Sequence, residues 1–155
     1  MHQYERRSKS NARDVIDYEI EMMEHSAARV LSRPPNRSDF DQFAFLEAFL
    51  LHFRILLEFF GKPEARYRDN LYFQKPQTCD VDPSEETLDA VKKLAANLET
   101  RWGWKLNKFL AHPTEPRYTT TRSWAVQEMR DDMRALVAHW RSSCRGESQA
   151  KLRLF

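Results

Sequence analysis

The sequence predicts a single all-α domain, folded as an up-and-down bundle of four to five helices. One observation behind this prediction is the apolar run over residues 40–60, which is far too long for an ordinary strand. A second is that three other segments carry apolar residues at the three- and four-residue spacing of amphipathic helices. A third is that the prolines fall between these segments and not inside them.

The first helix is expected from Ser10 to about Leu31, with Ser10 or Asn11 as its cap. Pro34 and Pro35 end it because proline cannot continue the hydrogen-bond ladder. Its core-facing stripe consists of Ile16, Ile20, Met23, Ala27 and Val30. A second, narrower apolar edge consists of Val15, Tyr18 and Met22. We expect this edge to contact another helix of the bundle or, alternatively, a partner subunit.

Residues 40–60 are expected to form the central helix of the domain, capped by Ser38 or Asp39. Apolar residues cover nearly its whole circumference, which predicts burial on several sides. Gly61 occupies the position where a left-handed residue commonly ends a helix. The polar residues form one narrow stripe, Glu47, Arg54 and Glu58. We interpret this stripe as a satisfied polar seam, with a position at a dimer interface left open.

The third helix is expected to start at Asp82-Pro83-Ser84-Glu85, which combines a cap, a proline and an acidic first turn. Thr100 can cap a fourth helix that runs to His112 and is closed by Pro113. The pattern does not decide whether these two helices form one rod bent near Gly103.

The last helix is expected from Thr121 or Ser123 to about Cys144. Its apolar stripe consists of Val126, Met129, Met133, Leu136, Val137 and Trp140. We expect one domain over residues 1–155, with residues 1–9 and 146–155 as loose tails.

Composition limits the classes of function. A formal net charge of +2 does not by itself require a nucleic-acid partner, although basic residues cluster at both chain ends. Those clusters are either solvated ends or an electrostatic arm for RNA or an acidic partner. Cys79 and Cys144 have neither metal-ligand spacing nor the density of a disulfide scaffold, so we expect reduced thiols in a cytoplasmic protein. Charged residues interrupt the run 40–60, and no membrane span or signal peptide is expected.

The segment RWGWKLNKFLAHPTEPR, residues 101–117, is where chemistry is most readily placed. On a helical wheel one face is apolar and carries Trp102, Leu106, Phe109 and Pro113. The adjacent face carries Arg101, Lys105, Lys108 and His112. Three fixed cations beside a histidine lower its pKa, and a neutral imidazole next to a phosphate can act as a general base. The alternative is an ordinary solvated basic face whose terminal histidine interacts with the helix dipole.

The pattern around Asn107, Lys108, Ala111 and His112, placed after a long apolar helix and before an amphipathic one, resembles the HEPN superfamily and its bacterial abortive-infection branches. The resemblance implies a dimeric helical bundle and a metal-independent ribonuclease acting in bacterial stress, phage defence or toxin–antitoxin systems. Family members carry an arginine, a polar residue and a histidine on one late helix. His112 matches the histidine, and Asn107 or Lys108 matches the polar residue.

The family arginine has no counterpart at the expected spacing, where Lys105 is the one cation. The resemblance therefore implies that His112, Lys105 and Asn107 are catalytic and that Lys108 and Arg101 bind substrate. Arg117, after the loop, can supply a guanidinium instead. It implies RNA as a partner and no cofactor.

Two rival classes stay open, a non-catalytic interaction module and a metal-binding bundle. The metal interpretation needs three of the histidines to converge, namely His25, His52, His112 and His139. No His-x-x-x-His or Glu-x-x-His spacing supports it, so no metal site is predicted. We expect His52 to be a core histidine that is hydrogen bonded across helices.

Overall fold

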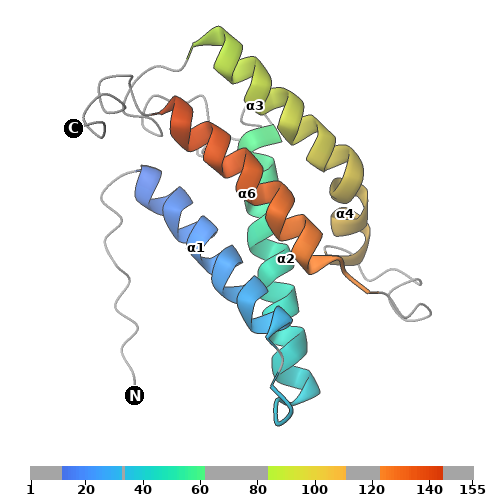
Figure 1. The fold of residues 1–155 in the computed structure, drawn as a ribbon. Helices are drawn as coiled ribbons and strands as arrows, with labels where there is room; N and C mark the ends of the chain where they lie inside the picture. The colour runs from blue at the N-terminus through green and yellow to red at the C-terminus, as the bar shows by residue number, and fades with distance from the viewer. Residues whose placement is uncertain (1–11, 33, 62–83, 111–122, 145–155) are drawn as a thin grey trace.

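The structure, a computed structural model, describes residues 12–32, 34–61, 84–110 and 123–144 (Figure 1). Every regular element in these ranges is helical, which confirms the predicted all-α bundle. The elements are α1 (Ala12–Leu31), α2 (Asp39–Gly61), α3 (Glu85–Leu98), the π-helical turn η2 (Glu99–Gly103), α4 (Trp104–Leu110) and α6 (Val126–Ser143). The predicted tails lie outside the described residues. None of the described helices is long and apolar enough to cross a membrane.

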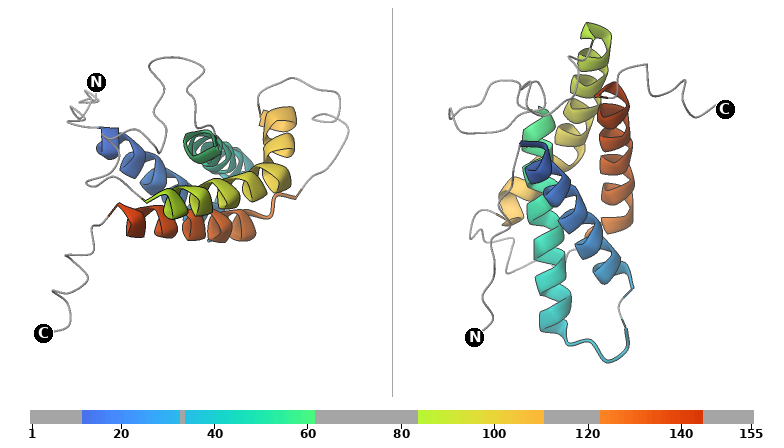
Figure 2. Two further views of the ribbon diagram at one scale, coloured as in Figure 1. Left: turned by 90° about the horizontal axis from the view of Figure 1, so that it is seen from above. Right: turned by 90° about the vertical axis from the view of Figure 1, so that its left-hand side faces the viewer.

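The helices form an up-and-down bundle with four rods, since α3, η2 and α4 follow one another without a break. Neighbouring rods contact each other in the order α1, α2, α3 and α6, and α6 closes the ring by returning to α1. Figure 2 shows α3 and α6 side by side, with α2 packed against α3 and α1. The lower ends of α1 and α2 extend beyond the ends of α4 and α6 in Figure 1.

The core is centred on the inner side of α2, where Phe49, Phe53, Leu56 and Phe60 are completely buried. Phe59 and Phe60 each meet the Trp140 ring edge-to-face, at centroid distances of 5.5 and 5.6 Å. The predicted stripes of the first and last helices are also buried, except that Val30 is only partly so. The assignment of α2 as the central helix therefore agrees with its packing.

One side of α2 is exposed, although apolar residues cover nearly the whole circumference of this helix. Phe40 is 88% exposed and Phe43 is 62% exposed, while Leu51 and Ile55 are also exposed. The first turn of α2 projects past the other helices. We call these four side chains the α2 outer stripe.

The helix ends differ in part from the sequence predictions. Ser38 caps α2 as expected, since its Oγ accepts a hydrogen bond from the Asp41 backbone N–H at 3.1 Å. Ser84, rather than Asp82, caps α3, because its side chain accepts from the Thr87 N–H. Gly61 does not adopt the expected left-handed conformation, since none of the described glycines has a positive φ. α6 begins at Val126 without a side-chain cap, later than the predicted Thr121 or Ser123.

The third and fourth predicted helices form one rod. Leu98 and Trp104, on either side of η2, both have right-handed helical dihedrals, so the chain passes from α3 to α4 through a π turn. Thr100 therefore does not cap a new helix, and its hydroxyl donates to the Ala96 carbonyl at 2.9 Å. Gly103 lies directly against the Glu99 side chain, where a Cβ would approach the carboxylate carbon to 2.4 Å.

Cys144 contradicts the expectation of reduced thiols. It caps the end of α6, is buried, and is disulfide-bonded. The chain's other cysteine, Cys79, lies outside the described residues. The separation of 65 positions between the two cysteines did not reveal this disulfide. A helical bundle can bring distant segments together, and spacing alone does not show which segments meet. The cytoplasmic location stays a prediction.

Candidate functional site

The sequence-predicted site falls mainly on α4. Lys105 and Asn107 are exposed on it and Lys108 is partly exposed. His112 and Arg117 lie outside the described residues, so their predicted roles stay predictions. Trp102 and Leu106 are buried, which confirms the predicted apolar face at these two positions.

Two tryptophans hold the lysine side chains of α4. The Lys105 ammonium lies 5.5 Å from the centroid of the Trp102 ring, and the Lys108 ammonium lies 4.7 Å from that of Trp104. Trp102 is itself held by α6, because its indole Nε1 donates a hydrogen bond to Asp132 at 2.9 Å. Both distances are in the range of a cation–π interaction. The lysines are thus held against the surface of α4 by neighbouring rings.

Trp104 differs from the other ring because 60% of its surface is exposed. An indole at the surface of a helix gives a flat apolar face on which a planar ligand can stack. Lys108 follows Trp104 by four residues and lies on the same side of the helix. We call Trp104, Lys105, Asn107 and Lys108 the α4 surface.

Arg101 links the π turn to α6. Its guanidinium donates to Glu128 at 2.6 Å and to Asp132 at 2.9 Å, and lies 4.7 Å from the centroid of the Trp102 ring. Two carboxylates therefore balance its charge. This arrangement accounts for Arg101 as a link between helices, and its role in substrate binding stays a prediction.

A narrow crevice lies between α2 and the α4 surface. It is lined by Arg54 and Glu58 of α2, by Glu99 of the π turn and by Asn107 of α4, among others. Its volume of about 20 Å³ has room for roughly one water molecule. Arg54 and Glu58 also make the predicted ion pair, at 3.4 Å. Arg54 and Asn107 therefore line the same crevice, together with the carboxylates of Glu58 and Glu99.

The crevice that Arg54 and Asn107 line together was missed at the level of sequence. Arg54 was assigned to a polar seam of the central helix, and Asn107 is 53 positions further along the chain. The one available signal was that Arg54 is a cation on a helix that is otherwise mostly apolar. Such a residue needs a polar neighbour from another element, but its spacing cannot identify that neighbour.

His52 has the structural role expected of it. Its Nδ1 is 2.6 Å from Glu19 Oε2 of α1, and both residues are buried. The ring also meets Tyr18 edge-on, at a centroid distance of 6.1 Å, so the second edge of α1 contacts another helix of the bundle. Glu19 was not identified from the sequence as the partner of His52.

Metal-ligating side chains do not gather in the part of the chain that the structure describes. No three or more histidine, cysteine, aspartate and glutamate side chains there could hold one ion. His52 is bound to Glu19, and the His25 ring meets Phe45 edge-on at 6.4 Å.

Comparison with known proteins yields no relative, since no family model, curated protein or solved structure matches this chain.

Proposed function

We propose that the chain binds single-stranded RNA across the α4 surface. The observation that carries the proposal is the exposed Trp104 indole with the Lys108 ammonium over its ring, next to Lys105, whose ammonium lies over the Trp102 ring. Proteins that bind single strands combine cations along the phosphate backbone with aromatic rings on which bases stack. Trp104 would stack one base, and the two ammonium groups would contact the flanking phosphates.

The resemblance to HEPN ribonucleases extends this proposal to cleavage without a metal. His112 would act as the acid or base that handles the 2′-hydroxyl or the leaving oxygen, and Lys105 and Asn107 would hold the scissile phosphate. Arg54, which pairs with Glu58 and lines the same crevice as Asn107, would supply the guanidinium that α4 itself lacks. A guanidinium can bind a phosphate with two hydrogen bonds, whereas a lysine acts as a point charge. The setting in bacterial stress or phage defence depends on the resemblance alone.

The binding proposal is tested by fluorescence anisotropy with a labelled RNA pool of mixed sequence. Trp104→Ala is expected to weaken binding by about tenfold, because one stacked base contributes about 1–3 kcal/mol. The double variant Lys105→Ala/Lys108→Ala is expected to reduce the steepness of the slope of log K against log salt concentration by about 1.4. This is about 0.7 for each phosphate that the variant no longer neutralises. Lys92→Ala/Lys93→Ala, which removes two exposed lysines from α3, is the matched control. Equal affinity and salt slope in all variants would contradict the proposal.

Cleavage has a separate test with the same RNA pool. Activity is expected to persist in a chelator and to be absent on DNA, which lacks the 2′-hydroxyl. His112→Ala is expected to reduce the rate by about 10²–10⁴-fold, as for a positioned acid–base group. RNA that is bound but never cut would remove the ribonuclease proposal and leave RNA binding in place.

We also propose that the protein is a homodimer, with the α2 outer stripe as the contact surface. Phe40, Phe43, Leu51 and Ile55 expose apolar surface along one side of α2, and the exposed Glu47 lies on the same side between Phe43 and Leu51. A contiguous apolar strip rimmed by polar residues is typical of an interaction site. A two-fold contact would bury the same strip on both subunits. This surface is also what a non-catalytic interaction module would use.

A further inference from the structure

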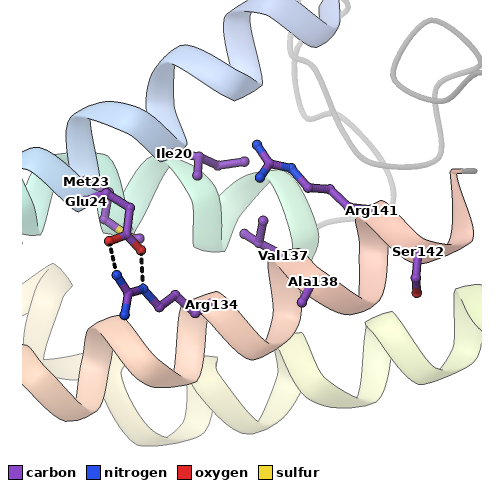
Figure 3. A pocket seen from close by; sticks show the side chains of 8 residues that line it. All are labelled: Ile20, Met23, Glu24, Arg134, Val137, Ala138, Arg141 and Ser142. Carbon is purple, nitrogen blue, oxygen red and sulfur yellow. Dashed lines mark hydrogen bonds and ion pairs between the residues drawn. The ribbon is translucent and has the colours of Figure 1, made fainter. Parts of the chain in front are cut away.

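A cavity of about 610 Å³ lies between α1 and α6, away from the α4 surface (Figure 3). Its lining is mixed: Ile20 and Met23 of α1 and Val137 and Ala138 of α6 are apolar, and the other lining residues are Glu24, Arg134, Arg141 and Ser142. Small-molecule sites typically have volumes of about 300–1,000 Å³ and mostly apolar walls with a few polar groups. The volume of this cavity therefore falls in the range of small-molecule sites, and its lining offers both apolar and charged groups to a ligand.

Ion pairs join α1 to α6 at the two ends of the cavity. At one end Arg141 Nη2 donates to Asp17 Oδ1 at 2.6 Å. At the other end Arg134 donates to both oxygens of Glu24, at 2.6 and 2.7 Å. The two acids are seven residues apart on α1 and the two arginines seven apart on α6, so the bridges stand about 10 Å apart. The bridges hold the helices in place around the cavity.

Two arginines take part in the ion pairs at each end, with one carboxylate, Asp17, at the Arg141 end and two, Glu24 and Asp131, at the other. Glu24 also accepts from Arg130 at 2.8 Å, and a further acid, Asp131, is 3.9 Å from Arg134. Burial raises the pKa of Glu24, but hydrogen bonds from Arg134 and Arg130 outweigh burial and leave that pKa below its ordinary value. Glu24 thus stays ionised at neutral pH and binds its arginines firmly.

The Arg141 end has more capacity for a ligand. Asp17 is 3.8 Å from Arg13 as well as 2.6 Å from Arg141, so two guanidinium groups share one carboxylate. A guanidinium has five N–H donors, and Arg141 uses one of them on Asp17. Figure 3 shows the Arg141 side chain extending from α6 toward Ile20 on α1. Donors of a partly exposed arginine are therefore available beside the apolar side chains of this cavity.

We propose that this cavity binds a small organic anion with an apolar body. The body would lie on the apolar side chains of the lining, and its carboxylate, sulfonate or phosphate would receive hydrogen bonds from Arg141. The charge of Arg141 selects an anion, since charge-assisted hydrogen bonds to such groups are stronger than neutral ones. The apolar side chains select against a bare inorganic anion, because burial of apolar surface favours the bound state only for a ligand with an apolar body. This inference is independent of RNA binding.

The test uses 8-anilinonaphthalene-1-sulfonate, a fluorescent anion with an aromatic body, titrated into the full chain. One probe is expected to bind per chain, and octanoate is expected to displace it. The matched neutral compound 1-octanol, which has the same chain length and no charge, is expected to displace it at least about tenfold less well, because the charged group is what Arg141 binds. Equal displacement by both compounds would overturn the proposal.

Two variants locate the site. Ala138→Trp fills the cavity and is expected to abolish the fluorescence increase, while Ala96→Trp adds the same ring to an exposed position of α3 and is expected to leave it unchanged. Arg141→Gln is expected to weaken octanoate by about tenfold, against no change in the control Lys92→Gln. Far-UV circular dichroism melts verify folding. A probe that responds to neither cavity variant binds elsewhere, which would overturn the proposal.

Discussion

The inner and outer sides of α2 carry the same kind of side chain in opposite surroundings. On the inner side Phe49, Phe53 and Phe60 are completely buried among three other rods. On the outer side Phe40 and Phe43 project into solvent on a turn that extends beyond the bundle. Hydrophobicity alone therefore does not place a phenylalanine in the core. Whether a phenylalanine of α2 is buried depends on where the other described rods lie, because they are too few to cover the whole circumference of α2.

The largest expected effect is the difference in unfolding free energy between a substitution on the inner side of α2 and one on the outer side. Phe53→Ala is expected to lower the free energy of unfolding by about 3–5 kcal/mol, since it removes a ring from a fully packed core. Phe40→Ala, the same chemical change on the outer side, is expected to change it by less than about 0.5 kcal/mol. Urea denaturation of both variants measures the difference. Similar destabilisation in the two variants would mean that the two sides are not distinct.

The elements of this fold were predictable from the sequence, and the contacts between them were not. The spacing that places Met129, Met133 and Leu136 in the core acts within one helix, so it can be recognised in a single segment. Which side of α2 faces outward depends on where the other rods lie. That arrangement is set by many weak contacts between helices, and it produces no pattern within a single segment of the sequence.

The site shows the same limit. The α4 positions of Lys105, Asn107 and Lys108 follow from helical periodicity, and the structure places all three at the surface to different degrees. That Arg54 and Asn107 line one crevice depends on how two helices pack against each other, which periodicity cannot give. The ion pairs of Arg101 with α6 are likewise long-range.

A smaller effect is expected at the buried polar pair that joins α1 to α2. Glu19→Ala is expected to destabilise by about 1–3 kcal/mol, because it leaves the buried His52 ring without its hydrogen-bond partner. The double variant Glu19→Ala/His52→Ala should cost less than the sum of the two single variants, since both remove the same contact. Thermal or urea melts of the four proteins give the coupling. Strict additivity would show that the 2.6 Å contact is not formed in solution.

The smallest effect on stability is expected for substitutions in the α2 outer stripe. Such substitutions should instead change how the chains assemble. The double variant Phe43→Ser/Leu51→Ser removes two members of the α2 outer stripe. Because both side chains are exposed, the free energy of unfolding of the isolated chain should change by less than about 0.5 kcal/mol per site. If two copies meet through this stripe, the wild-type protein has twice the 18.5 kDa chain mass in light scattering. The variant then has the mass of one chain at the same concentration.

Trp104→Ser is the matched control for this assembly test, because Trp104 is as exposed as Phe43 but lies on the α4 surface. It should leave the dimer intact while weakening RNA binding. A wild-type protein that stays at the mass of one chain up to its highest soluble concentration would contradict the dimer. In that case the apolar stripe would have to be assigned to a different partner protein, because solvent exposure of four large apolar side chains along one helix side is costly without a covering surface.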